Sequence, residues 1–128
     1  LKRHEISVRA FILLRPPYLS EAEGLEWACR SMDFAFACGV DVCSIIPVRA
    51  GNGALDQLAE GGYFSEPSIG SLERVLEYGM GLGKGLVLAD LWDLERFSGC
   101  TKCFTGRKER HHHMNLGQKP LPPVSCSC

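Results

Sequence analysis

Three short apolar runs, separated from one another by helical patterns, constrain this chain more than any other feature. The runs cover residues 6–14, 40–48 and 86–91. Near-continuous apolarity over such lengths is typical of strands buried on both faces, as in parallel sheets. Strands that alternate with helices predict βαβ units with right-handed crossovers, and therefore an α/β fold with a parallel sheet.

Capping residues mark the helices between these strands. Ser20 and Glu23 have the spacing of a capping box, and apolar residues follow them at helical intervals. A short helix is expected over about residues 54–60. A third helix begins at Ser68 or Ser71, either of which can cap it.

The character of the chain changes after Gly99, which predicts two regions. Residues 1–99 carry the strand and helix patterns, whereas residues 100–128 are polar and proline-rich and contain four of the seven cysteines. A short helix is expected over about residues 104–115 of this extension. Three strands are too few to close a barrel, so we expect either missing partner strands or self-association through an exposed sheet edge.

Composition excludes several classes of protein. Fourteen basic and fifteen acidic residues give a net charge of -1, which predicts no extended basic surface for nucleic acid or membrane. No apolar run approaches the length of a membrane-spanning helix, and Arg9 and Arg15 interrupt the first run, so it does not resemble a signal peptide. We therefore expect a cytoplasmic protein. The start at Leu1, without an initiator methionine, favours a fragment.

Two segments resemble radical S-adenosylmethionine enzymes. Residues 8–22, VRAFILLRPPYLSEA, are similar to the fifth strand and following turn of their barrel, and residues 44–58, SIIPVRAGNGALDQL, to the sixth strand and its exit. Within this family, the chain resembles the group that includes the elongator catalytic subunit and the archaeosine-pathway radical enzyme, both of which act on tRNA. The resemblance covers about residues 5–97. It implies that residues 1–99 are the last strands of a partial (β/α) barrel, with the missing N-terminal half as partner.

The resemblance also implies a cofactor site at the carboxyl ends of the strands, where βα barrels place their active sites. The turn after the first strand would lie beneath the adenosine of S-adenosylmethionine, and the end of the second strand would contact the adenine. The residues implied are Leu14, Arg15, Pro16, Ile46, Pro47, Val48, Arg49 and Asn52. For Arg49 and Asn52, the residues alone leave open a purely structural role in a tight, glycine-rich loop.

The chain departs from this family in its cysteines. The C-x3-C-x2-C arrangement that binds the [4Fe–4S] cluster is absent. We therefore expect the parent enzyme to hold the cluster and S-adenosylmethionine for tRNA or nucleoside modification, with an RNA or nucleoside as its substrate, and this chain alone to be inactive. The alternative is a non-catalytic, zinc-stabilised α/β module that binds a protein partner.

Cys100, Cys103, Cys126 and Cys128 form two close pairs near the end of the chain. Four thiolates are the ligand set of a closed structural zinc site, and we favour that interpretation. Free or redox-active thiols and an auxiliary iron–sulfur cluster remain as alternatives. The adjacent histidines 111–113 are interpreted as solvated surface residues, and Trp27 and Trp92 as core or interface aromatics.

Overall fold

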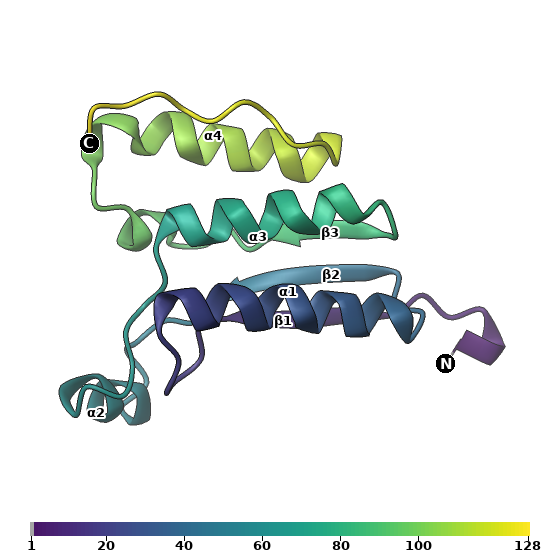
Figure 1. Cartoon of the computed structure of the whole chain (residues 1–128), viewed down its shortest axis with the longest axis horizontal. Helices are drawn as coiled ribbons and strands as arrows, with labels where there is room; N and C mark the ends of the chain where they lie inside the picture. The colour runs from purple at the N-terminus through teal and green to yellow at the C-terminus, as the bar shows by residue number, and fades with distance from the viewer. Residues whose placement is uncertain (1) are drawn as a thin grey trace.

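The computed structural model describes residues 2–128 and contains a three-stranded parallel sheet in the order β1-β2-β3 (Figure 1). The strands are β1 (Arg9–Leu14), β2 (Val42–Pro47) and β3 (Leu86–Ala89). In the register, Leu14 lies opposite Pro47 and Ile45 opposite Ala89, so the carboxyl ends of all three strands lie at the same end of the sheet. This confirms the predicted α/β fold with parallel strands; the three strands form an open sheet.

Two helices cover one face of the sheet, and a third flanks it (Figure 1). The helical segments are η1 (Lys2–His4), α1 (Glu21–Ala37), α2 (Ala54–Glu60), α3 (Ile69–Leu82), η2 (Leu94–Phe97) and α4 (Thr101–Gly117). Helices α1 and α3 lie side by side on the sheet, and α4 lies beyond α3 next to β3. No described helix is both long and apolar enough to cross a bilayer.

The helices begin largely where their capping residues predict. The capping box of α1 is present: Ser20 N–H donates to Glu23 Oε2 at 2.8 Å, and Glu23 N–H donates to Ser20 Oγ at 3.3 Å. Of the two candidates for α3, Ser68 is the N-cap and accepts a hydrogen bond from Ser71 N–H at 3.1 Å. Helix α4 is longer at both ends than the pattern of residues 104–115 indicates.

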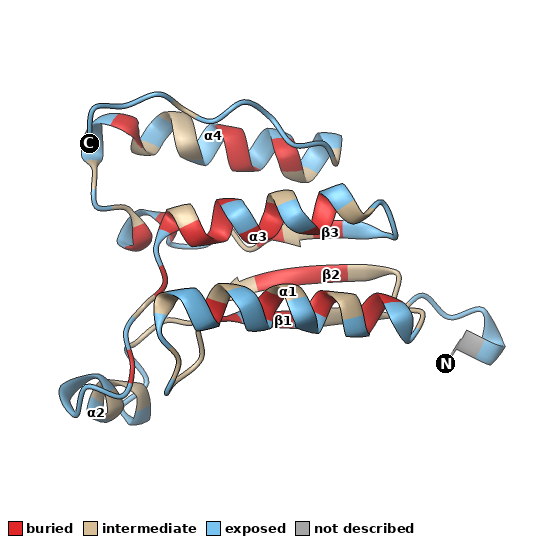
Figure 2. Ribbon diagram, in the orientation of Figure 1, coloured by how far each residue is buried: buried red, intermediate tan, exposed pale blue. Residues whose placement is uncertain are grey.

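The core lies between the sheet and helices α1 and α3 (Figure 2). Every second strand side chain points into it, and Ile12, Ile45 and Val87, one from each strand, are at most 5% exposed. Helix α3 approaches the sheet closely at Gly79, where an added Cβ would lie 2.8 Å from a methyl group of Val87. The absence of a side chain at Gly79 therefore sets the distance between this helix and β3.

The opposite face of the sheet is open along β1 and at the start of β3, which corrects the expectation that the strands are buried on both faces, whereas Ser44 in the middle of β2 points to the same face and is 7% exposed. Phe11, Leu13 and Leu86 point to this face and are 66%, 53% and 50% exposed. No other element of residues 2–128 covers them. Parallel sheets in folded proteins normally have both faces covered, so this apolar face is unusual for a free-standing domain.

Side-chain amides of α4 close the outer edge of β3. Asn115 accepts from Ala89 N–H at 2.8 Å and donates to Ala89 C=O at 2.9 Å. Gln118 does the same for Val87, with both distances 2.9 Å. Each amide directs one N–H donor and one oxygen acceptor at the strand, as a peptide group does, so the two side chains occupy the place of a fourth strand.

We predict that Asn115→Asp destabilises the protein by about 1–3 kcal/mol, because the carboxylate keeps an acceptor for Ala89 N–H but leaves Ala89 C=O without its donor. Urea unfolding measures the loss, and amide exchange at Val87 and Ala89 should accelerate. His112→Ala, an exposed change on the same helix, is the control and should cost less than about 0.5 kcal/mol. Equal stability of Asn115→Asp and wild type would show that the amide does not secure this edge.

Candidate metal centre and strand-end site

The tail after α4 returns along the helix and brings the two cysteine pairs together (Figure 1). The helix ends at Gln118, whose left-handed backbone (φ 53°) allows the chain to reverse. Arg110 then anchors the returning tail, because its Nε donates to the carbonyl oxygens of Leu121 at 3.1 Å and Pro122 at 2.9 Å. The chain thus ends beside the N-terminus of α4.

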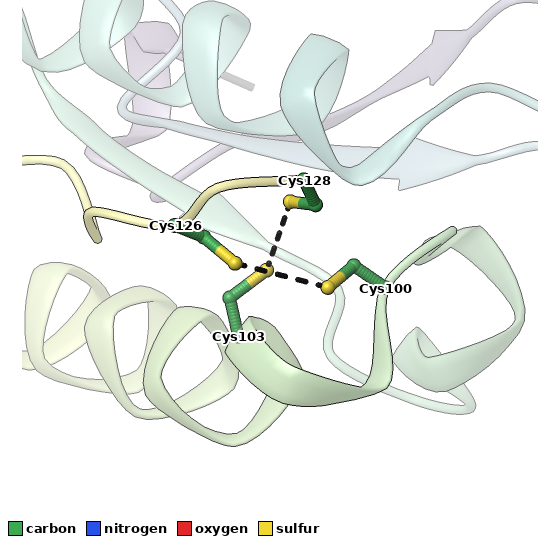
Figure 3. A group of neighbouring side chains, drawn as sticks. All are labelled: Cys100, Cys103, Cys126 and Cys128. Carbon is green, nitrogen blue, oxygen red and sulfur yellow. Dashed lines mark hydrogen bonds between the residues drawn. The ribbon is translucent and has the colours of Figure 1, made fainter.

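The four predicted cysteines converge at this point (Figure 3). Cys100 is the N-cap of α4 and Cys103 lies in its first turn, while Cys126 and Cys128 come from the tail. All four Sγ atoms lie within 4.8 Å of one another, with 3.8 Å between Cys100 and Cys126 and 3.7 Å between Cys103 and Cys128. This group of four cysteines can hold a metal ion.

The sulfur separations match a single tetrahedral ion better than disulfides. With metal–sulfur bonds of about 2.3 Å, a regular tetrahedron places its sulfurs about 3.8 Å apart. A disulfide would need about 2.05 Å. The four thiols are therefore placed so that they could bind one metal ion as tetrahedral thiolate ligands without a movement of the backbone.

The pKa values of Cys100 and Cys128 are shifted in opposite directions. Cys100 lies at the N-terminus of α4, and the backbone N–H of Cys103, helped by the Cys128 thiol and the backbone N–H of Lys102, lowers the pKa of Cys100 to about 7. The neighbouring thiols of Cys126, Cys100 and Cys103 raise the pKa of Cys128 to about 12. One thiolate is thus accessible near neutral pH, whereas full deprotonation of the group needs a cation.

Buried charges attach α4 to α3. Arg110 is only 5% exposed and pairs with Glu77, and its Nη1 lies 3.7 Å from Glu73 Oε1. Arg107 Nε lies 3.6 Å from the same Glu73 oxygen. Because buried charges are costly without partners, these pairs fix the position of α4 against α3. From the sequence, Arg107 and Arg110 were expected to offset the negative charge of a tetrathiolate zinc centre, and their ion pairs with α3 were not predicted.

The three histidines do not behave alike, which partly corrects the prediction of a solvated run. His112 and His113 are exposed, but His111 is fully buried. Its Nδ1 lies 2.7 Å from the carbonyl oxygen of Arg107, so Nδ1 carries the proton. Its Nε2 has no hydrogen-bond partner among the described residues. The ring is therefore neutral, and it serves α4 packing rather than metal binding.

At the carboxyl ends of the strands, the structure places the residues of the implied cofactor site on two sides of the sheet. Leu14 and Pro47 are buried toward the helices. Ile46 points to the open face, where it helps to line a hollow of about 270 Å³. The complete lining of this hollow is Arg9, Phe11, Ser44, Ile46, Leu88, Ala89, Asp90 and Asn115.

The two arginines of that site make ion pairs at the ends of the strands. Arg15 Nη1 lies 2.5 Å from Glu21 Oε2 and donates to the carbonyl oxygen of Glu66 at 2.9 Å. Arg49 pairs with Asp90 at 3.0 Å, and its guanidinium lies 5.1 Å from the ring centres of both Trp92 and Phe97. Both side chains hold neighbouring loops together.

The remaining residues of the implied site lie in the turns. Asn52 Oδ1 accepts from Leu55 N–H at 2.9 Å and so helps to start α2. Pro16 and Val48 are partly buried where the chain leaves β1 and β2. Sequence reasoning missed Glu66, which accepts hydrogen bonds from Ala50 N–H at 2.8 Å and from Arg96 Nε at 3.1 Å. Its place in a connector without a motif offered no signal.

Comparison with known proteins provides no relative. No protein family, no curated protein and no solved structure matches the chain.

We predict that His111 makes the protein less stable in mild acid. Burial lowers the pKa of His111, and Glu73, Arg107 and Arg110 are the charged groups that act on it. The unfolded chain binds a proton near pH 6.5 that the folded chain does not bind, so the free energy of unfolding falls as pH drops below about 6.5, by up to about 1.4 kcal/mol per unit.

His111→Gln, which cannot titrate, should flatten this dependence between pH 7 and 5, as measured by urea unfolding at equal metal content. The exposed His113→Gln is the matched control and should retain the wild-type slope. A slope unchanged in His111→Gln would assign the acid sensitivity to other groups.

Proposed function

We propose that this chain is the C-terminal part of a radical S-adenosylmethionine enzyme, and that its strand ends form one wall of the adenosine site. The proposal rests on one observation: the carboxyl ends of the strands lie together, with Leu14 opposite Pro47, beside an open apolar sheet face. In βα barrels the carboxyl edge of the strands carries the active site and the inner face is apolar.

In this proposal the backbone and apolar groups of the strand ends contact the cofactor. Ile46 faces the hollow on the open side of the sheet, where an adenine ring would meet apolar side chains such as Ile46 and Phe11 and polar ones such as Ser44. Arg15 and Arg49 already pair with Glu21 and Asp90, so they act as positioning residues that fix the two turns. S-adenosylmethionine would supply the radical chemistry when it is bound next to a reduced cluster.

The residues present do not fit the [4Fe–4S] cluster of that chemistry. Cys29 lies on α1, Cys43 is buried on the helix-covered side of β2, and Cys38 follows the end of α1. These three do not form the required motif, so the proposal assigns the cluster to another part of the enzyme. An RNA or nucleoside substrate would likewise be bound mainly elsewhere, since the chain has a net charge of -1.

Titration of the isotope-labelled chain with S-adenosylmethionine tests the proposed wall by NMR. We expect chemical-shift changes confined to Leu14, Ile46 and Val48, and at least about a tenfold weaker affinity in Ile46→Asp, because a charge would replace the apolar contact. Leu86→Asp is the matched control, on the same face at the opposite end of the sheet. Absence of shifts at millimolar cofactor would contradict the proposal.

A second observation, the geometry of the four thiols, favours structural zinc. A [4Fe–4S] cluster attaches each cysteine to a different iron, so its thiolates surround a body of eight atoms. Sulfurs within 4.8 Å of one another suit a single ion instead. The zinc would clamp the tail onto α4, and a non-catalytic, zinc-stabilised interaction module is the alternative function that this clamp supports. Free thiols before metal binding require a reducing compartment, so the proposal includes the cytoplasm.

We predict that the purified chain binds about one equivalent of zinc and that chelation lowers its melting temperature by at least about 5 °C. Cys103→Ser should remove most of the metal, because it breaks the tetrathiolate set, whereas Cys38→Ser, exposed and outside the group, should not. Elemental analysis and thermal melts measure both effects. Iron in place of zinc would correct the metal's identity, and unchanged melting after chelation would reject the clamp.

A further inference from the structure

The two edges of the sheet differ in a way that indicates a partner. Val48 N–H and Val42 N–H both donate to β1, to the carbonyl oxygens of Leu14 and Val8 at 3.2 Å each. The N–H and C=O groups of successive strand residues point alternately to the two sides of the strand. The even-numbered residues from Val8 to Leu14 direct these groups toward β2, so the odd-numbered residues between them direct theirs away from β2. These residues are Arg9, Phe11 and Leu13.

Nothing in residues 2–128 pairs with this outer edge of β1. Natural proteins usually protect an exposed edge with proline, a bulge or several charges, yet β1 contains none of these except Arg9. The edge of β3, in contrast, is closed by Asn115 and Gln118. The sheet can therefore be extended in one direction only, beyond β1.

Helix α1 carries a matching apolar surface on the same side of the molecule. Trp27 and Phe34 are seven residues apart and are 52% and 72% exposed, which excludes a core position for Trp27. Asp33 marks the side of α1 that faces α3, since it accepts a hydrogen bond from Tyr78 at 2.8 Å. At 100° per residue, the buried stripe of α1 separates Asp33 from Trp27, so the aromatic pair lies on the flank away from α3. Together with Arg30 and Ser31 this pair lines a hollow of about 330 Å³.

We infer that the edge of β1 and the Trp27–Phe34 flank of α1 form one docking surface for a strand–helix unit of the same parallel architecture. The strand of this unit pairs with the outer edge of β1, and its helix packs on Trp27 and Phe34. In the sheet, each strand lies next to the strand that precedes it in the sequence, in the order β1, β2, β3. The same right-handed rule places a preceding strand beside β1 and its helix beside α1.

A second copy of this chain satisfies these surfaces less well. A two-fold axis at the β1 edge would pair the two β1 strands and bring the two α1 flanks together, but both open sheet faces would remain exposed. Phe11, Leu13 and Leu86 would then stay in water in each copy. Further parallel strands, in contrast, twist and curl the sheet over that face. The inference deepens the proposed barrel function, although its evidence concerns only the sheet edge and α1.

Co-expression of this chain with the polypeptide encoded directly upstream, as two separate chains, tests the inference. We expect a 1:1 complex by sedimentation, with amide exchange at Phe11 and Leu13 slowed at least a hundredfold and exchange at Val87 unchanged. Phe34→Asp should weaken the complex at least tenfold, and Leu116→Asp, equally exposed but on α4, should not. Exchange measured in the continuous polypeptide gives the same readout if the upstream chain does not fold by itself.

Three results would overturn the docking surface: an upstream sequence without a strand–helix pattern, a homodimer that protects the same amides, or unprotected Phe11 and Leu13 in the continuous polypeptide. The proposed function fails separately. A protected β1 edge in an assembly that cannot form 5′-deoxyadenosine would reject the radical chemistry and keep the docking surface. An assembly that forms 5′-deoxyadenosine while its β1 edge stays unprotected would keep the radical chemistry and reject the docking surface.

Discussion

The peptide groups of a sheet edge need hydrogen-bond partners, and the structure depends on how this requirement is met at β3. Two side-chain amides, from Asn115 and Gln118, bind both the N–H and the C=O groups of Ala89 and Val87. Four hydrogen bonds at a protected edge hold α4 in one register along β3. The position of α4 then determines where the tail and the cysteines lie.

Helix α4 is too polar to be held by a continuous apolar stripe, so specific contacts replace one. The buried guanidinium of Arg110 joins α4 to Glu77 of α3 and to the carbonyl oxygens of the tail. Its pairing with both segments couples helix docking to tail docking. The cysteine group closes the far end of the same hairpin, so that Cys103 and Cys128, which are 25 residues apart in the sequence, have Sγ atoms only 3.7 Å apart.

Local patterns predicted the elements of this fold well, because each depends on residues close in sequence. The capping box at Ser20 and the strand centres around Ile12, Ile45 and Val87 are of this kind. The cysteine group was also predictable, since two close pairs of cysteines are a spacing typical of metal sites, although the spacing alone left redox-active thiols and an iron–sulfur cluster open. The amides that close β3 were not, because Asn115 and Gln118 resemble any exposed polar residues until the tertiary structure brings them to a strand edge.

The same limit explains the two arginines at the strand ends. In sequence, Arg15 and Arg49 follow strands and resemble ligand-binding side chains. In the structure, Arg15 meets the carboxylate of Glu21, six residues further on at the start of α1, whereas Arg49 meets that of Asp90 after β3 and also lies against two aromatic rings. A guanidinium committed in this way positions the backbone of its turn and leaves little charge for an anionic ligand. The hollow that remains beside the strand ends is lined by apolar side chains such as Phe11 and Ile46 and by polar ones such as Ser44 and Asn115, so its specificity depends on these residues and not on the two arginines of the turns.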